Sequence, residues 1–267
     1  MELLNYTALN RKHCRIDYHI HSLLSSDGRA TIFQLCERAQ SIRLDEIGVA
    51  DHLDLEPSDE GYGFFDYSTY TAIITQTRRI FGDRLVIRKG IEVDYQSIYE
   101  EEIRHLLKGM SFDYTIGSIH YLDHQLISPD LIARKGLKWV YEVYLKEVTS
   151  LAKSKLFQVI GHYDLVQKYL NSSGAAKFVE EREAALDEII SNNLFLEVNT
   201  KNLMDTYGDT VPRKSLVETY FRRGGRLFSI GSDAHFLEHV GIGVDEVRDF
   251  LAKLGKDEVR MIFEESG

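Results

Sequence analysis

The sequence predicts an α/β fold in which seven parallel strands close into a barrel and helices cover its outside. Short apolar segments alternate with amphipathic helical segments along the 267 residues, a pattern typical of parallel sheets. Most of the apolar segments end in His, Asp or Glu. A barrel brings all its strand ends to one face, which an open sheet would not do, and this chain length suits one barrel.

The expected strands share a short run of aliphatic or aromatic residues followed by a polar residue. By this criterion they span residues 15–21, 46–50, 85–91, 114–119, 157–160, 194–198 and 226–230. In the first strand the apolar residues alternate with Asp17, His19 and His21. Because side chains at i and i+2 of a strand share a face, we expect the two imidazoles to point the same way.

The expected helices carry apolar residues at helical spacing. They span residues 31–42, 68–81, 97–109, 137–153, 178–192, 215–223, 245–254 and 257–264. Thr31 with Gln34, and Ser97 with Glu100, have the spacing of capping boxes. Gly82 is placed to end the second helix. The segment 53–66 remains as a long loop, and loops of this length are often functional.

Composition limits the class of protein. The formal net charge is −10, which argues against a nucleic-acid binder, since such proteins present a basic face. A small anionic substrate stays compatible, because local cations can override the overall charge. The sequence shows no secretory leader and no membrane span, and Cys14 and Cys36 are best explained as reduced thiols. We therefore expect one cytoplasmic domain over residues 1–267.

Metal-binding side chains stand at six of the seven expected strand ends. They are His19, His21, His52, Glu92, His120, His162, Asp233 and His235. Six of the ten histidines thus fall in a small part of the chain, which scattered surface or core histidines would not do. Imidazole and carboxylate suit Zn, Fe and Mn. The remaining histidines fit ordinary positions, although two of them could line the site; they are His13, His105, His124 and His239.

Short motifs surround these positions. In chain order they are Asp17-x-His19-x-His21, Asp51-His52, Gly90-Ile91-Glu92-Val93, Ser118-x-His120, Gly161-His162 and Gly231-Ser232-Asp233-x-His235. The ordered set resembles the polymerase-and-histidinol-phosphatase (PHP) family from about residue 15 to residue 240. Within that family the sequence is most similar to the monofunctional histidinol-phosphate phosphatases. The resemblance implies a distorted (β/α)7 TIM-like barrel, in agreement with the strand count.

The resemblance also implies three divalent metal ions, drawn from Zn, Fe and Mn. The implied ligand sets are His19, His21, Glu92 and Asp233 for the first metal, Glu92, His120 and His162 for the second, and Asp27, His52 and His235 for the third. Glu92 and Asp233 are the implied catalytic residues, because they hold the metals that activate a hydroxide. Some relatives have His in place of Asp27. Asp51 lies outside the ligand sets and could orient a ligand.

The implied charge of the site suits a phosphomonoester. Three divalent ions bring +6, and the carboxylates of Asp27, Glu92 and Asp233 bring −3, which leaves about +3. Metal ions roughly 3.5–4 Å apart can share a hydroxide and clamp a phosphoryl group during in-line attack. A side-chain nucleophile is then unnecessary, and the sequence has no G-x-S-x-G elbow to supply one.

Phosphate binding also needs donors from the chain. Lys168, after the fifth strand, and Lys201, after the sixth, are the candidates. Some family members have arginine at both places, and lysine offers a point charge where arginine offers a bidentate pair of donors. Both residues could instead be solvated surface lysines, and Arg29 is a weaker alternative.

The hypothesis that follows is a metal-dependent phosphatase that converts L-histidinol phosphate to L-histidinol and phosphate in histidine biosynthesis. A second hypothesis keeps the site but changes the substrate to a phosphotyrosine protein, a sugar phosphate or a nucleotide, with residues 53–66 and 163–176 setting the choice. A third is a metal-stabilised binding module. Open coordination positions argue against it, because structural sites usually close theirs with protein ligands. The oligomeric state is left open.

Overall fold

The strands form a parallel ring that follows the order of the chain. The computed structural model describes residues 14–170, 177–204, 207–255 and 258–263. Each strand of the ring is parallel to the next. The ring consists of β1 (Ile16–Ile20), β2 (Glu46–Val49), β3 (His52–Leu53), β4 (Val86–Lys89), β5 (Glu92–Asp94), β6 (Ile116–Ser118), β9 (Val159–Ile160), β10 (Phe195–Asn199) and β11 (Leu227–Gly231).

Two positions of the ring hold interrupted strands. β2 pairs with β4, and after a break of two residues in each, β3 pairs with β5. Among the described residues, the strands of the ring therefore occupy seven positions. The ring closes between its last and first members through the parallel bridge of Ile20 with Ala234, where the His21 amide donates to the Ala234 carbonyl at 2.9 Å. The prediction of a distorted (β/α)7 barrel is confirmed.

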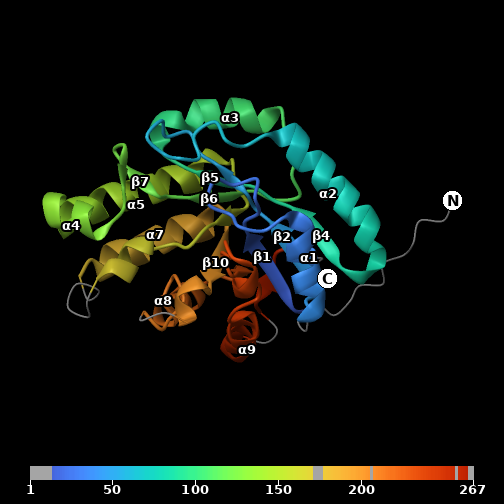
Figure 1. The fold of residues 1–267 in the computed structure, drawn as a ribbon. Helices are drawn as coiled ribbons and strands as arrows, with labels where there is room; N and C mark the ends of the chain where they lie inside the picture. Colours follow the sequence, from blue (N-terminus) through green and yellow to red (C-terminus); the bar gives the residue numbers. More distant parts are fainter. Residues whose placement is uncertain (1–13, 171–176, 205–206, 256–257, 264–267) are drawn as a thin grey trace.

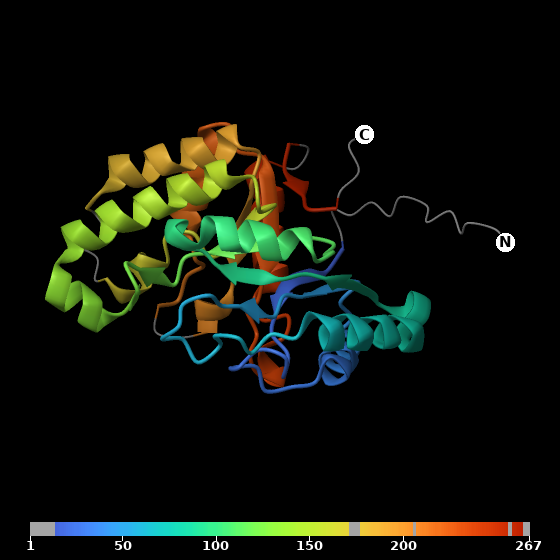
Figure 2. The same cartoon turned by 90° about the horizontal axis from the view of Figure 1, so that it is seen from above.

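Helices surround this ring (Figures 1 and 2). They are α1 (Ile32–Ser41), α2 (Tyr67–Phe81), α3 (Glu100–Lys108), α4 (Pro129–Lys135), α5 (Leu137–Ser154), α7 (Val179–Ser191), α8 (Lys214–Arg222) and α9 (Val244–Gly255). The capping box at the start of α1 is confirmed: Thr31 Oγ1 accepts from the Gln34 amide at 3.2 Å, and Gln34 Oε1 accepts from the Thr31 amide at 2.9 Å. Within the described residues, the helices lack the combined length and apolarity that a membrane crossing requires.

The core has an outer and an inner part. The outer part packs the helices against the strands and includes Cys36, which forms no disulfide with Cys14. The inner part fills the barrel below the strand ends. Its centre is Tyr114, whose ring lies against Gly48 and Gly90 and whose hydroxyl donates to the Tyr18 carbonyl at 2.5 Å. Neither glycine could carry a Cβ there, because the atom would overlap the Tyr114 ring.

The second predicted capping box is wrong. Ser97 begins a short 3-10 turn, and α3 starts only at Glu100. The amide and hydroxyl of Ser97 donate to Glu147 of α5, at 2.6 and 2.8 Å. The Glu100 carboxylate instead accepts from the Tyr95 hydroxyl at 2.7 Å. Tertiary partners therefore replace the local hydrogen bonds that the spacing suggested.

The last predicted helix is also wrong in its described part. Residues Arg260–Met261 form β12, which extends the sheet parallel to β11. The carbonyls of Arg226, just before β11, and of Phe228, within it, are the acceptors: Arg260 N–H donates to Arg226 O at 2.8 Å, and Ile262 N–H donates to Phe228 O at 3.1 Å. The sequence analysis also missed α4 and the hairpin of β7 (Tyr121–Leu122) and β8 (Gln125–Leu126).

A buried carboxylate ties the first strand to the segment after the last. Asp17 is fully buried. Its Oδ1 accepts from the Ser232 amide at 2.8 Å, and its Oδ2 accepts from the Gly241 amide at 2.9 Å. These bonds reinforce the closure of the ring beside His19 and Asp233.

We expect Asp17→Asn to lower the free energy of unfolding by about 1–3 kcal/mol. The asparagine side chain has the same shape, but its NH2 group must face one of the two backbone N–H groups that Asp17 now accepts from. That buried N–H group therefore loses its acceptor. Urea denaturation would measure the change, with Asp83→Asn as the control, since Asp83 is exposed on the turn after α2. Equal midpoints for the two variants would contradict the role given to Asp17.

Candidate metal centre

The structure gathers the side chains predicted as metal ligands at the end of the barrel where the strands terminate. In the described part of the chain they form three groups, and within each group one candidate ligand atom per residue lies within 4.8 Å of the others. The groups are His19, His21 and Asp233; Glu92, His120 and His162; and His21, Asp27, His52 and His235.

Glu92 belongs to the group with His120 and His162 and also faces the histidines of the group with Asp233. Its Oε2 is 3.1 Å from His19 Nε2 and 3.5 Å from His21 Nε2. Its Oε1 is 3.0 Å from His162 Nε2 and 3.7 Å from His120 Nε2. One oxygen thus faces each group, which is the geometry that a bridging ligand requires.

The surroundings of Glu92 favour its ionised form. Burial by itself raises the pKa of this carboxyl group, but positive charge on His19 and His52 outweighs burial and holds the pKa well below its usual value. The Ser118 hydroxyl also donates to Glu92 Oε1, at 2.5 Å. A carboxylate in this state can bind cations on both of its oxygens.

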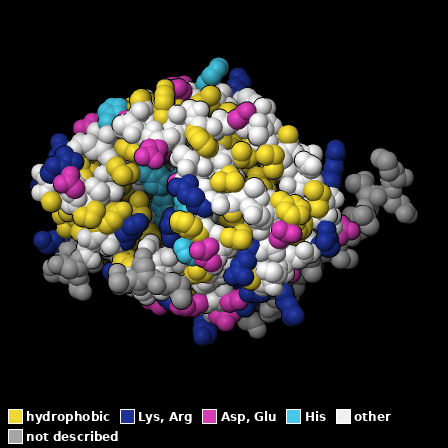
Figure 3. Space-filling view, viewed as in Figure 1, with side chains coloured by type: hydrophobic (Ala, Val, Ile, Leu, Met, Phe, Trp, Pro, Cys, Tyr) yellow, Lys and Arg dark blue, Asp and Glu magenta, His cyan; other side chains and the backbone are white. Residues whose placement is uncertain are grey.

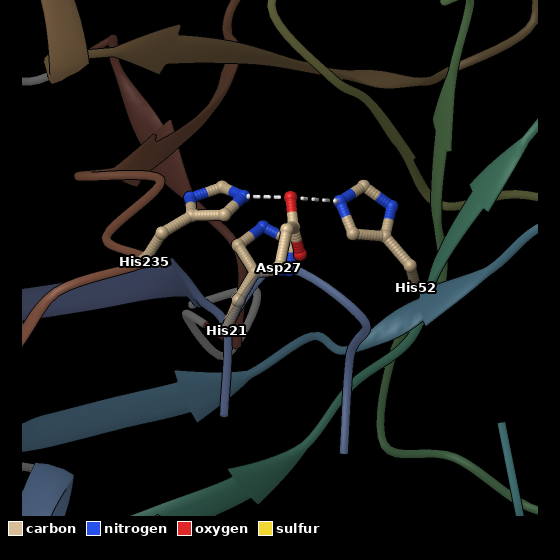
Figure 4. Close-up of side chains that lie close together, drawn as sticks. All are labelled: His21, Asp27, His52 and His235. Carbon is tan, nitrogen blue, oxygen red and sulfur yellow. Dashed lines mark ion pairs between the residues drawn. The ribbon is translucent and has the colours of Figure 1, made fainter. Parts of the chain in front are cut away.

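The third group centres on Asp27, in the loop after β1. Asp27 Oδ2 is 2.7 Å from His235 Nε2 and 3.7 Å from His52 Nε2. Figure 4 shows Asp27 between these two rings, with His21 beside them. The His21 ring centroid is 4.4 Å from that of His52 and 4.2 Å from that of His235. His21 therefore joins the first group to the third.

The donor atoms fit divalent metal ions. Buried polar atoms without a hydrogen-bond partner are rare in folded proteins, because each one costs free energy. Among the described residues, such atoms gather here: His19 Nε2, His21 Nε2, His52 Nδ1 and Asp27 Oδ1. Imidazole and carboxylate together suit Zn, Fe or Mn. We propose the residues of the three groups as the ligands of three such ions.

Further carboxylates contact the rings or backbone amides of the histidines and orient them. Glu197 of β10 is one that the sequence analysis missed: its Oε1 is 2.5 Å from His19 Nδ1, and its Oε2 accepts from the His162 amide at 2.6 Å. Asp94 was also missed. It accepts from the His120 amide at 2.9 Å and lies 3.6 Å from His120 Nδ1. The available signal was a charged residue on the inner side of an otherwise apolar strand.

Asp51 lies next to the histidines of the site and contacts them indirectly. It accepts from the amide and the hydroxyl of Ser22, both at 2.6 Å, and from the Ser25 hydroxyl at 2.8 Å. Ser25 Oγ is in turn 3.5 Å from His21 Nδ1 and accepts from the His52 amide at 2.9 Å. Asp51 therefore reaches two histidines of the site through Ser25.

A cavity of about 250 Å³ opens over the three groups. Figure 3 shows the hollow, with histidine side chains at its floor and both acidic and basic side chains at its rim. Lys168 and Lys201 both line it. Lys201 Nζ donates to Asp233 Oδ1 at 2.9 Å, and Lys168 Nζ lies 5.1 Å from the centroid of the Tyr169 ring. Arg29 is exposed, and its guanidinium donates to the carbonyls of Ser26 and Gly28.

The other histidines lie apart from the cavity lining. His124 Nδ1 pairs with Glu56 at 2.8 Å, His105 lies on α3, and His239 lies on the turn after β11. His13 falls outside the described residues. The three histidines that the structure describes are thus absent from the cavity lining, and their ordinary interpretation stays a prediction.

The fold and the site define a parallel α/β barrel with clustered metal-ligand side chains at its C-terminal face. The model of the PHP domain family matches residues 17–201, more than half of the chain, and the chain belongs to that family.

Individual relatives extend the likeness over most of the chain. A probable histidinol-phosphatase of Thermotoga maritima is 29% identical and covers 89% of this chain and 91% of its own. One of Deinococcus radiodurans is also 29% identical and covers 87% and 92%. The crystal structure of histidinol phosphate phosphatase from Lactococcus lactis, complexed with zinc, L-histidinol and phosphate, superposes with a TM-score of 0.81. It is 23% identical and covers 92% of this chain and 95% of its own.

We expect Glu197→Gln to weaken metal binding by about ten- to a hundredfold at the site that includes His19. The glutamine oxygen is drawn to the His162 amide, so its NH2 group faces His19 Nδ1. That contact favours the tautomer with the proton on Nε2, the atom proposed to bind metal. Dialysis against buffers of fixed free zinc, followed by elemental analysis, would measure the change.

Glu218→Gln is the matched control, because Glu218 is exposed on α8. Wild-type metal content in Glu197→Gln at every free zinc concentration would show that Glu197 does not support the histidine.

Proposed function

We propose that the chain is a metal-dependent phosphomonoesterase that hydrolyses L-histidinol phosphate to L-histidinol and phosphate. The observation that carries the proposal is the likeness to the Thermotoga maritima and Deinococcus radiodurans relatives, which are named probable histidinol-phosphatases and match over nearly their whole length. The donor groups at the floor of the cavity support it, because they fit the metals that such a hydrolysis uses.

The chain's own part in the reaction is to fix positions. Bound divalent ions would lower the pKa of water and neutralise the oxygens of a phosphoryl group. Glu92 would contribute one oxygen to each of two metal sites, and Asp233 would be a ligand of one of them from the opposite strand end. In the hydrolysis a water oxygen bonds to phosphorus while the bond from phosphorus to the histidinol oxygen breaks, and that oxygen takes up a proton.

Two lysines complete the phosphate site in this proposal. Lys168 follows β9 and Lys201 follows β10, so their cations stand on neighbouring walls of the cavity. A local cluster of cations and metals attracts a phosphate dianion even though the whole chain carries a net charge of −10. The same overall charge supports a small-molecule substrate over a nucleic acid. We further propose that residues 1–267 act as one domain in the cytoplasm, where histidine biosynthesis takes place.

The direct test is phosphate release by metal-analysed protein. We expect turnover of L-histidinol phosphate to exceed that of phosphotyrosine peptides, sugar phosphates and nucleotides in kcat/KM. Removal of metal by a chelator should abolish turnover, and added Zn, Fe or Mn should restore it, because unfilled ligand groups cannot activate water. A higher kcat/KM for another phosphoester would show that L-histidinol phosphate is not the preferred substrate. Full turnover by protein shown to be metal-free would refute the mechanism.

We expect Lys168→Met and Lys201→Met each to lower kcat/KM by about ten- to a hundredfold. A hydrogen bond to a charged group contributes about 1.5–3 kcal/mol, and inorganic phosphate binding should weaken by a similar factor. Lys→Arg at either position should keep part of the activity, since the charge remains while the geometry differs.

Lys138→Met is the control, because Lys138 is exposed on α5 and its side chain keeps 79% of its accessible surface. Metal content must be measured in each variant, since Lys201 contacts Asp233. Wild-type kinetics in both Met variants at the cavity would show that the lysines do not bind phosphate.

A further inference from the structure

The cavity carries opposite charges on opposite walls. Asp54 and Asp59, in the loop after β3, line the same cavity as the two lysines. In the ring of seven strand positions, β3 is three steps from β9 and also three steps from β10, which is the greatest separation the ring allows. The loop with the aspartates therefore faces the walls with Lys168 and Lys201.

Asp54 is a buried carboxylate without a hydrogen-bond donor among the residues that the structure describes. Its side chain lines the cavity, yet the residue is only 8% exposed. Among the described residues its ion-pair partner is His52, whose Nδ1 lies 3.6 Å away, beyond hydrogen-bond reach. Gly61 packs so closely on Asp54 Oδ2 that a Cβ there would overlap it. Its oxygens remain open to the cavity, so a cation that enters there can reach the carboxylate.

Asp59 is fixed in place from two sides. Its Oδ1 accepts from the Gly61 amide at 2.6 Å, and its Oδ2 accepts from the Tyr121 hydroxyl of β7 at 2.7 Å. Both donors are neutral, and across the described chain neither a lysine nor an arginine forms an ion pair with Asp59 or Asp54. Each oxygen keeps a second lone pair for a ligand. The orientation of Asp59 is thus set before any ligand arrives.

We propose that Asp54 and Asp59 form a subsite for a cationic ammonium group on the substrate. The inference rests on the proposed function and deepens it, because it names the residues that recognise the ammonium group of L-histidinol phosphate. The phosphate lies over the metal groups and the lysine walls, and the ammonium group turns toward the two aspartates. A phosphomonoester without a cation offers the two carboxylates no positive partner, so the subsite discriminates against it.

A supporting role for Asp54 behind His52 is the main competing explanation. Variants of Asp59 distinguish the two explanations. Asp59 bonds to Gly61 and Tyr121 and to none of the proposed metal ligands, so a loss of charge there does not act through His52. Asp59→Asn keeps the shape of the side chain while it removes the charge: its oxygen can accept from the Gly61 amide, and its NH2 group can donate to the Tyr121 hydroxyl. It is therefore the primary variant, and Asp54→Asn is the second, with metal content measured in both.

The experiment compares L-histidinol phosphate with 3-(imidazol-4-yl)propyl phosphate, which lacks only the ammonium group. We expect metal-loaded wild-type protein to favour the first substrate. In Asp59→Asn the ratio of the two kcat/KM values should fall by about ten- to a hundredfold, as for loss of a charged hydrogen bond. Asp54→Asn should lower the ratio in the same direction. Glu60→Gln, next to Asp59 but exposed and outside the cavity lining, should leave the ratio at its wild-type value.

Binding of the two alcohols provides a readout apart from turnover. Calorimetric titration with L-histidinol and with 3-(imidazol-4-yl)propan-1-ol should show the same fall in preference in Asp59→Asn. An unchanged ratio in Asp59→Asn, including an equal loss on both compounds, would overturn the subsite. If wild-type protein hydrolysed neither phosphate but still bound L-histidinol through Asp59, the proposed function would fail and the subsite would stand.

Discussion

One buried carboxylate sets the geometry of the whole site. Glu92 is 1% exposed, and five imidazole rings among the described residues approach its two oxygens within 3.0–3.7 Å. Those rings come from β1, β3 and the segments after β6 and β9. The curved ring of parallel strands brings these segments, which are distant in sequence, to one point. The barrel is therefore the condition for the metal centre as well as its support.

The histidines are oriented by further carboxylates, and these link the site to the strands. Glu197 holds the His19 ring and also the backbone amide of His162, so two of the donor groups share one anchor. Asp94 holds His120, and Asp51 acts on His21 and His52 through Ser25. Loss of any of these supports would weaken metal binding, because such partners fix the orientation of the ligand rings.

Much of the fold follows from local pattern. Apolar strands, helical periodicity and the Thr31 capping box all predict elements that the structure contains. The errors have tertiary causes. The pattern around Ser97 cannot reveal that Glu147, fifty residues away, takes its hydrogen bonds. The pairing of β12 depends on the open edge of β11, which periodicity within residues 257–264 does not record.

The residues of the site also differ in whether the sequence alone could predict them. Strand-end histidines are visible in sequence because parallel strands deliver them to one face. Glu197 was missed because a single glutamate in an apolar strand has many possible partners, and only the folded ring selects His19. Asp54 was missed because nothing in its neighbourhood of sequence tells that Gly61 folds back against it. The charge on the wall facing the lysines therefore became visible only in three dimensions.

The bridge between Ile20 and Ala234 has a consequence for the timing of assembly. Asp233 and His235 emerge from the ribosome long after the histidines of β1, so the groups that contain them stay incomplete until β11 joins β1. The group of Glu92, His120 and His162 needs no residue beyond His162. A nascent chain could thus capture one ion early, and the full set must wait for the two ends of the ring to meet.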